Sequence, residues 1–233
     1  MKKIDKGVSP DWFESWKSDF RVKNGREPHY EGDFLNDEFE AGVRRRKLKE
    51  NLIKEQGKIC CYCMGRIDMD TAHIEHFWPK GVSQYADRDL DYNNLFACCE
   101  GKRVTQKDAD LLVTWDEHCG HKKEDWYDEN MIMPTDYRIE DLFTYYDNGE
   151  IHPIGRKTTT NIASKMKSAL GLDSFHLKRN RKEAIDQMYD DLEDDLLDDP
   201  DYIMECIDYY NSIFDGEYMP YCGVLVDCLK RFL

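Results

Sequence analysis

Two histidines and a glutamate lie within four positions of the segment TAHIEHFWPKG, residues 71–81. Imidazole and carboxylate groups are well suited to binding a metal ion or moving a proton near neutral pH. Side chains alternate between the two faces of a strand, so His76 would share a face with Ile74 while Glu75 takes the other, unless the strand ends there. The segment is either one wall of a reaction site or a strand whose polar residues are satisfied by their neighbours.

Six of the nine cysteines fall in one window of the chain, residues 60–119. In a reducing compartment, clustered cysteines favour a metal site over disulfides. Cys60 and Cys63 form a C-x2-C pair, which can supply two thiolates of a tetrahedral structural zinc site. The expected zinc ligands are Cys60, Cys63, Cys99 and Cys119. Cys98 is the rival for the third place, and a set of buried free thiols is the alternative. The remaining cysteines, expected to be small buried side chains, are Cys206, Cys222 and Cys228.

The order of motifs in this window resembles that of the HNH endonucleases, whose ββα-metal fold is often held together by a zinc knuckle. The C-x2-C pair is followed by IEH (74–76), NNL (93–95), Cys99 and CGHKK (119–123). With helical patterns on both sides, the resemblance implies an α+β fold. Its centre would be a zinc-stapled ββα-metal (HNH) nuclease core, with N-terminal helices before it and a mainly helical region after it.

The resemblance also implies a role for each residue of the motifs. Hydrolysis of a phosphodiester needs an activated water and a cation for the charge that builds on phosphate. Glu75 would bind Mg²⁺ or another divalent ion, and His76 would be the general base. Asn94 would fix the loop that orients His76, and His121 would complete the metal site.

The chain departs from the HNH pattern in two places. Glu75 stands where aspartate is commoner. Gly120 directly follows the last cysteine and cannot be a ligand, so His121 lies one step further round the helix. Glu124 or Asp125 could take the place of His121 as the last ligand.

Within the HNH group, the chain is similar to the retron-associated HNH endonuclease family, which includes the nuclease subunit (PtuB) of Septu anti-phage systems. The similarity runs from MKKIDKGVSPDWFESW through ICCYCMG, HIEHFWPKG, DYNNLFACCEG and CGHKK to LGLDSFHLKRNRKEA. It implies an anti-phage effector that cuts nucleic acid and is controlled by an ABC- or SMC-like ATPase subunit (PtuA-like). DNA is expected as the substrate ahead of RNA. In retron systems a reverse transcriptase and its RNA–DNA product accompany the effector. The alternatives are an effector that cuts RNA, such as tRNA, with the same site, and a non-catalytic zinc adaptor for the ATPase.

The net charge of −15 means that the chain as a whole repels nucleic acid. Binding a nucleic acid therefore needs a metal ion, a partner or a local cationic track, for which the candidates are Lys80, Lys102, Arg103, Lys122 and Lys123. Ordinary solvated side chains are the alternative for each of these. His73 could support a metal ligand or contact a phosphate. Fourteen Asp or Glu and no Lys or Arg lie between Glu183 and Glu217, a surface suited either to a basic partner or simply to solvent.

Four regions are expected along the chain. They are an N-terminal helical segment (1–58), the zinc-containing HNH core (59–130), a β-hairpin extension (131–157) and an acidic helical region suited to partner docking (158–233). No apolar run is long enough to span a membrane and the first residues do not form a secretory signal, so a cytoplasmic location is expected.

Local signals place the elements within these regions. Pro10 predicts the start of a helix that ends at Asn24-Gly25, and a second helix is expected over about 36–56. FTYYDNGEIHPI predicts a hairpin with a tight two-residue turn at Asn148-Gly149. A further helix is expected over about 160–170. The next would begin with Asp173 as its cap and run to about residue 198, with Pro200 ending it. The last helices are expected over 202–214 and 223–232.

Overall fold

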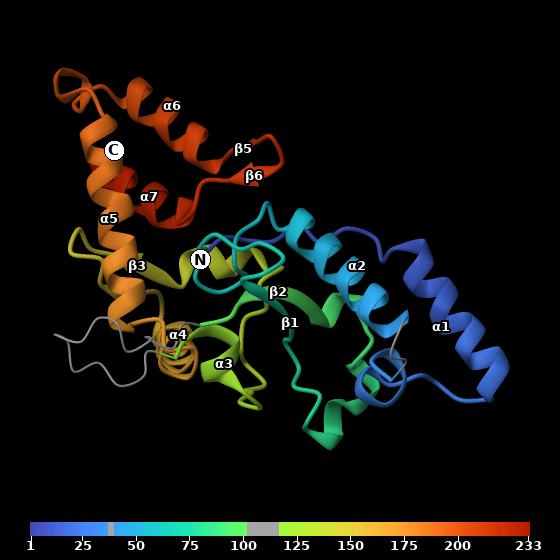
Figure 1. Ribbon diagram of the computed structural model, residues 1–233. Coiled ribbons are helices and arrows are strands. Elements are labelled where there is room, and N and C mark those ends of the chain that lie inside the picture. Colours follow the sequence, from blue (N-terminus) through green and yellow to red (C-terminus); the bar gives the residue numbers. More distant parts are fainter. Residues whose placement is uncertain (37–39, 102–116) are drawn as a thin grey trace, which may run out of the picture.

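The computed structural model describes residues 1–36, 40–101 and 117–233 (Figure 1). Within these residues, helices and short two-stranded sheets surround one continuous buried apolar core. Helices α1 and α2 lie at one end of the molecule, the first sheet lies in the middle, and α5, α6 and α7 lie at the other end (Figure 1). No helix in these residues is long and apolar enough to cross a membrane.

The N-terminal helices form an aromatic subcore. Helix α1 (Asp11–Asn24) begins after Pro10 and ends at Gly25, whose φ of 70° is left-handed, as predicted. Phe13 on this helix packs edge-to-face against Phe34 with ring centroids 5.6 Å apart. The described part of helix α2 spans Glu40–Glu55. Residue 36 is not helical, and residues 37–39 lie outside the described part of the chain.

The central unit is a strand, a long loop, a second strand and a short helix. Strand β1 (Ala72–His76) pairs antiparallel with β2 (Leu95–Cys99), so that His73 lies opposite Cys98. Helix α2 packs on this sheet, and helix α3 (Cys119–Lys123) packs beside β2 (Figure 1). The order of elements is that of the expected ββα unit. In the loop between the strands lie two 3₁₀ turns, Ser83–Arg88 and Tyr92–Asn94.

One buried amide fastens this unit together. Gln56, just past the end of α2, is 1% exposed. Its Nε2 donates to the carbonyl oxygens of Ile59 and Ala97 at 2.9 and 2.8 Å, and its Oε1 accepts from the Ala97 N–H at 2.7 Å. A buried side chain that satisfies three backbone groups fixes the cysteine turn after α2 against the middle of β2.

The predicted hairpin forms, but the expected two-residue turn is wrong. Strand β3 (Phe143–Tyr145) pairs with β4 (Ile151–Pro153), with Tyr145 opposite Ile151. The Tyr146 N–H donates to the Glu150 carbonyl, which leaves a three-residue loop, 147–149. A two-residue turn would place Tyr145 opposite His152, whereas the observed register pairs two buried side chains. Burial therefore decided the register against the local turn preference.

The C-terminal region is helical, with boundaries that differ from those expected. The helices are α4 (Lys157–Ala169), α5 (Phe175–Asp191), α6 (Pro200–Asn211) and α7 (Cys222–Leu229). Ser174, and not Asp173, caps α5, since its side chain accepts from the Leu177 N–H. Pro200 begins α6 behind the cap Asp199 instead of ending α5. A small hairpin of β5 (Ile213–Phe214) and β6 (Glu217–Tyr218) was not anticipated.

Three backbone hydrogen bonds join this region to the central unit. The Cys119 N–H donates to the Leu170 carbonyl at 2.8 Å. The Tyr221 N–H donates to the Met64 carbonyl at 2.9 Å, and the Tyr218 N–H donates to the Gly57 carbonyl at 2.9 Å. Cys222 and Cys228 are buried, as expected, and Cys206 is half-buried.

A pair of glycine substitutions tests the packing of the β3–β4 loop. Gly149 and Gly216 both have φ of +80°, but a Cβ at Gly149 would lie 2.0 Å from the Lys178 carbonyl oxygen, whereas a Cβ at Gly216 would meet nothing within 4 Å. We expect Gly216→Ala to cost about 1 kcal/mol for backbone strain alone. Gly149→Ala should cost about 2 kcal/mol more, because the loop must move off α5. Urea unfolding of both variants measures the difference, and equal losses would contradict the packing described here.

Candidate functional site

Four sulfur atoms from three separate segments meet beside the central sheet. The Sγ atoms of Cys60, Cys63, Cys99 and Cys119 lie within 4.8 Å of one another. Cys63 and Cys99 are 3.8 Å apart, close to the roughly 3.8 Å edge of a tetrahedron of thiolates about 2.3 Å from a zinc ion. The Tyr62 and Gly65 N–H groups donate to the Cys60 and Cys63 sulfurs. This donor set fits a structural zinc ion, and it contains the four cysteines that the sequence indicated.

Cys98 lies close to the same cluster but in a different set. Its Sγ is 3.8 Å from that of Cys60 and accepts from the Gly120 N–H at 3.2 Å. The group to which it belongs, with Cys60 and Cys61, has only three sulfurs. Since tetrahedral zinc needs four ligands, the geometry favours Cys99 over Cys98 as the third ligand.

The thiol pKa values reflect this crowding. Burial raises the pKa of Cys119 well above its ordinary value. Burial opposes ionisation of Cys60 as well, but hydrogen bonds from the neighbouring thiols hold its pKa well below the ordinary value. Four thiolates at this spacing repel one another, and a dication would offset half of their charge and favour loss of the remaining protons.

Strand β1 presents its two faces to different partners. Glu75 turns toward α3 and is 7% exposed; its Oε1 lies 2.9 Å from Lys123 Nζ and accepts from the Tyr62 hydroxyl at 3.1 Å. Burial alone would raise the pKa of Glu75, but the neighbouring His73 and Lys123 outweigh it and keep that pKa below its ordinary value. Lys123 is itself buried and donates to the His76 carbonyl. Its charge is paired with Glu75, so it does not contribute to an exposed cationic track.

On the same side of the sheet, three further side chains converge. His121 Nε2 lies 2.9 Å from Glu100 Oε2, and His73 Nδ1 lies 3.8 Å from the same oxygen. The three ligand atoms are within 4.8 Å of one another, and Glu100 and His121 are half-exposed. Glu100 was not anticipated, because it comes near His73 only through the pairing of β1 with β2, and the sequence does not give that register.

His76, the last residue of β1, turns to the opposite face. Its Nε2 lies 2.9 Å from the Asp89 carbonyl oxygen, and its ring packs edge-on against Tyr30 with centroids 4.6 Å apart. A carbonyl oxygen only accepts, so Nε2 carries the proton and Nδ1 keeps its lone pair. Burial lowers the pKa of His76 to about 4, so the imidazole is neutral at pH 7.

Asn94 ties together the two ends of the loop that faces His76. Its Oδ1 accepts from the Trp78 N–H at 2.6 Å, and its Nδ2 donates to the carbonyls of Trp78 and Arg88 at 3.0 and 2.8 Å. Asn94 is fully buried. Arg88 directly precedes Asp89, so these bonds also hold the carbonyl that fixes the His76 ring.

The remaining candidate cations lie apart from one another or outside the described part of the chain. Lys80 pairs with Glu31 and stands over the Tyr30 ring, near His76. Lys122 is exposed on α3, which ends at Lys123, so Glu124 and Asp125 lie beyond the helix. Lys102 and Arg103 lie outside the described residues.

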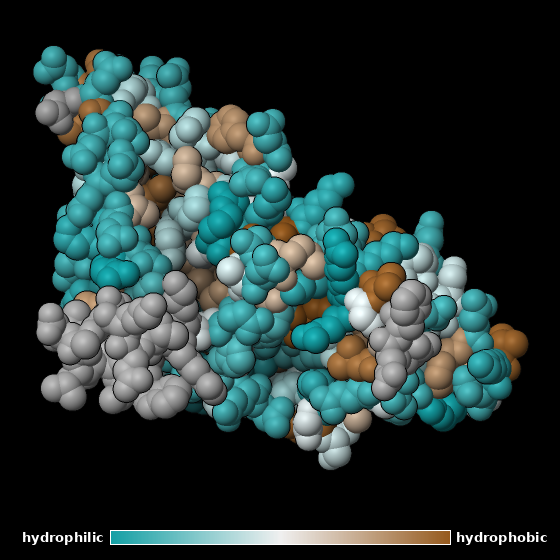
Figure 2. Space-filling model, viewed as in Figure 1, coloured by the Kyte–Doolittle hydropathy of each residue, from teal (hydrophilic) through white to brown (hydrophobic). Residues whose placement is uncertain are grey.

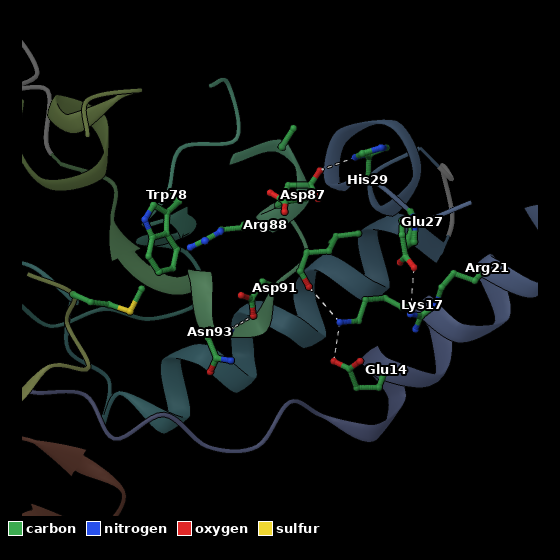
Figure 3. A pocket seen from close by; sticks show the side chains of 15 residues that line it. Glu14, Lys17, Arg21, Glu27, His29, Trp78, Asp87, Arg88, Asp91 and Asn93 are labelled. Carbon is green, nitrogen blue, oxygen red and sulfur yellow. Dashed lines mark hydrogen bonds and ion pairs between the residues drawn. The ribbon is translucent and has the colours of Figure 1, made fainter. Parts of the chain in front are cut away.

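A pocket of about 770 Å³ lies behind the loop that holds His76 (Figure 3). Arg88 stands over the Trp78 ring there, 4.3 Å from its centroid. Its lining has three cations, Lys17, Arg21 and Arg88, but five carboxylates, Glu14, Glu27, Asp87, Asp89 and Asp91. The excess of carboxylates makes the pocket unsuited to a phosphate.

Comparison with known proteins bears on the class of protein to which the chain is similar. No family model matches the sequence. Over 161 residues, 67% of this chain and 71% of the relative, it is 29% identical to the protein assigned as the HNH endonuclease of retron Vc95 in Vibrio cholerae serotype O1 biovar El Tor. Over 109 residues, 43% of this chain and 42% of the relative, it is 30% identical to the corresponding protein of retron Ec83 in Escherichia coli.

These similarities identify the chain as an HNH endonuclease, a hydrolase that acts on phosphodiester bonds. The relatives that it resembles among these enzymes are those of retrons.

Substitution of the two adjacent cysteines tests the zinc assignment. Cys99→Ala should lose the bound zinc and destabilise the fold by several kcal/mol, because metal binding and folding are coupled at such sites. Cys98→Ala should keep one zinc per chain. Elemental analysis of both purified variants gives the answer, and loss of zinc from Cys98→Ala alone would reverse the assignment.

The state of His76 can be measured directly by NMR. We expect its imidazole to titrate near pH 4, with the proton on Nε2 at pH 7, because burial disfavours the charged ring. Between pH 6.5 and about 4, the unfolded chain binds a proton that the folded chain refuses, so stability should fall as the pH falls through this range. A His76 resonance that titrates near 6.5, or a proton on Nδ1, would contradict the buried carbonyl contact.

Proposed function

We propose that this protein is a metal-dependent endonuclease in which His76 is the general base, and that DNA is its substrate. We further propose that it is the effector of a retron- or Septu-type anti-phage system controlled by an ATPase subunit. The observation that carries the catalytic part is the fixed, neutral ring of His76, whose Nε2 is bound to the Asp89 carbonyl.

The chemistry follows from that ring. Nδ1 of His76 takes a proton from a water molecule, and the water oxygen attacks phosphorus while the opposite P–O bond breaks. The leaving oxygen takes a proton from solvent. A divalent ion, when bound, supplies positive charge for the phosphate. A pKa near 4 makes Nδ1 a weak base in the free protein, but the negative phosphate beside it stabilises the imidazolium and raises its proton affinity on substrate binding.

Asn94 and Tyr30 act on His76 without touching substrate. Asn94 holds the loop that carries the Asp89 carbonyl, and the Tyr30 N–H donates to the Asp89 carboxylate at 2.8 Å while its ring packs on the imidazole. Both are positioning residues that limit rotation of the ring. A base held in one orientation avoids part of the entropic cost of reaching the reactive geometry.

The negative charge of the C-terminal region supports the proposal that it binds a partner with a basic surface. Helices α5 and α6 and the β5–β6 hairpin carry the run of carboxylates, and hydrophilic side chains cover the edge formed by α5 (Figure 2). About half of each of four apolar side chains is exposed on and beside α6, namely Met204, Tyr209, Ile213 and Phe214. Apolar contacts within a charged rim are typical of a docking surface. We propose that the ATPase subunit binds here, with a reverse transcriptase and its RNA–DNA product present if the system is a retron.

The proposed catalytic role is tested with His76→Ala, purified with and without the proposed ATPase subunit. Cleavage of plasmid DNA should fall about 10²- to 10⁴-fold, the usual contribution of a general base. Zinc content and ATPase binding should be unchanged. His152→Ala is the matched control, because His152 is exposed and lies far from His76 in the sequence.

The outcomes separate the alternatives. Undiminished DNA cleavage by folded His76→Ala would overturn the general-base role, and unchanged phage defence as well would indicate a zinc adaptor. Cleavage of tRNA without cleavage of DNA by the unmodified protein would overturn the DNA assignment and favour an RNA-cutting effector.

A further inference from the structure

We propose that His73, Glu100 and His121 form a second metal site that binds a first-row transition-metal dication such as Mn²⁺, and that Glu75 orients a ligand of this site instead of binding the ion. The inference goes beyond the proposed function, since these ligands lie on the face of strand β1 opposite to His76. Its test measures metal binding without nucleic acid, so it stands or fails separately from cleavage.

The three ligand atoms are close enough to share one ion. Ligands about 2.1 Å from a metal lie roughly 3.0–3.4 Å from one another. His121 Nε2 and Glu100 Oε2 are 2.9 Å apart, and His73 Nδ1 is 3.8 Å from the same oxygen. Small side-chain movements bring all three to a common centre, and the half-exposed Glu100 and His121 are free to make them.

The environment of His73 points to a ligand on Nδ1. This atom is buried and has no hydrogen-bond partner within the described part of the chain. A buried imidazole nitrogen without a partner is costly unless something binds it. On the other side of the ring, Nε2 lies 3.6 Å from Glu75 Oε2. A proton on Nε2 would face Glu75 and leave the Nδ1 lone pair for the ion, the carboxylate–histidine–metal arrangement common in metalloproteins.

Glu75 is poorly placed to be a ligand itself. Its Oε1 is held by the Lys123 ammonium and the Tyr62 hydroxyl. A dication on Glu75 would lie close to the buried positive charge of Lys123, and two cations repel strongly where water is scarce. Orienting His73 through Oε2 keeps the Lys123 pair intact.

Gly120 makes the site compatible with helix α3. A Cβ at this position would lie 2.5 Å from His73 Nε2 and 2.6 Å from Glu75 Oε2. The space where the HNH pattern has a helical ligand is therefore filled by the His73 ring and the Glu75 carboxylate. Gly120 offers no ligand at the position after the last cysteine, and His121 and Glu100 would provide ligands further out.

The donor set selects the kind of ion. Two imidazoles and one carboxylate suit transition-metal dications, whereas Mg²⁺ prefers oxygen ligands in octahedral geometry. Three protein ligands leave coordination positions open toward solvent, where water or a phosphate oxygen of the substrate can bind.

The experiment titrates the zinc-loaded protein with Mn²⁺ and follows free Mn²⁺ by EPR, because Mn²⁺ competes poorly for thiolates. We expect one Mn²⁺ per chain that millimolar Mg²⁺ does not displace. Pulsed EPR should detect two imidazole nitrogens on the ion. Glu100→Gln and His121→Ala should each weaken binding at least about tenfold, and Glu75→Gln less, because its amide oxygen still accepts from His73.

A control variant and a check of folding accompany this titration. His152→Ala removes a comparable exposed histidine beside a glutamate, Glu150, and should leave Mn²⁺ binding unchanged. Unchanged zinc content and melting temperature confirm that each variant is folded. One imidazole nitrogen, with binding lost in Glu75→Gln and kept in Glu100→Gln, would overturn the proposal and return Glu75 to the ligand set. Absence of Mn²⁺ binding would also overturn the proposal and leave His121 and Glu100 as an ion pair only. Mn²⁺ binding without cleavage of nucleic acid would support the metal site and count against the proposed nuclease.

Discussion

The structure depends on one geometric constraint, the meeting of four sulfur atoms from three distant segments. Cys60 and Cys63 come from the turn after α2, Cys99 from the end of β2 and Cys119 from the start of α3. Holding these together fixes α3 beside the β1–β2 sheet. The polar residues beside the cluster lie on the elements that these sulfur atoms bring together.

That constraint divides strand β1 between two chemical environments. One face meets α3 and collects charges, with Lys123 against Glu75 and the imidazoles of His73 and His121 near Glu100. On the other face, His76 contacts the Tyr30 ring and the Asp89 backbone carbonyl. Lys123 links the two faces, because its ammonium contacts both the Glu75 carboxylate and the His76 carbonyl oxygen.

Sequence patterns were most informative where spacing expresses a chemical need. The C-x2-C pair and the later cysteines indicated the sulfur cluster, and Pro10 and Gly25 marked the ends of α1. Sequence patterns gave a wrong prediction where packing in the folded chain decides the local structure. Asn148-Gly149 favoured a two-residue turn, but the buried Tyr145 and Ile151 required another register.

The site residues likewise divide into those that sequence motifs indicate and those that only tertiary contacts bring together. His76 and Asn94 could be named from their motifs, and both contact the loop that contains Arg88 and Asp89. Glu100 and the pairing of Lys123 with Glu75 could not, because both arise from strand register and helix placement. Side-chain exposure is likewise a tertiary property, and Lys123 resembled a surface lysine in sequence while it is fully enclosed in the fold.

The hydrogen bond from Tyr221 to Met64 has a mechanical consequence. Met64 directly follows Cys63, and a Cβ at Gly223 would lie 2.9 Å from the Met64 sulfur, so α7 presses against the turn that carries two of the clustered thiols. A force applied to the acidic end of the molecule reaches that turn without passing through a flexible linker. A displacement of α7 would therefore also move the turn that carries Cys60 and Cys63.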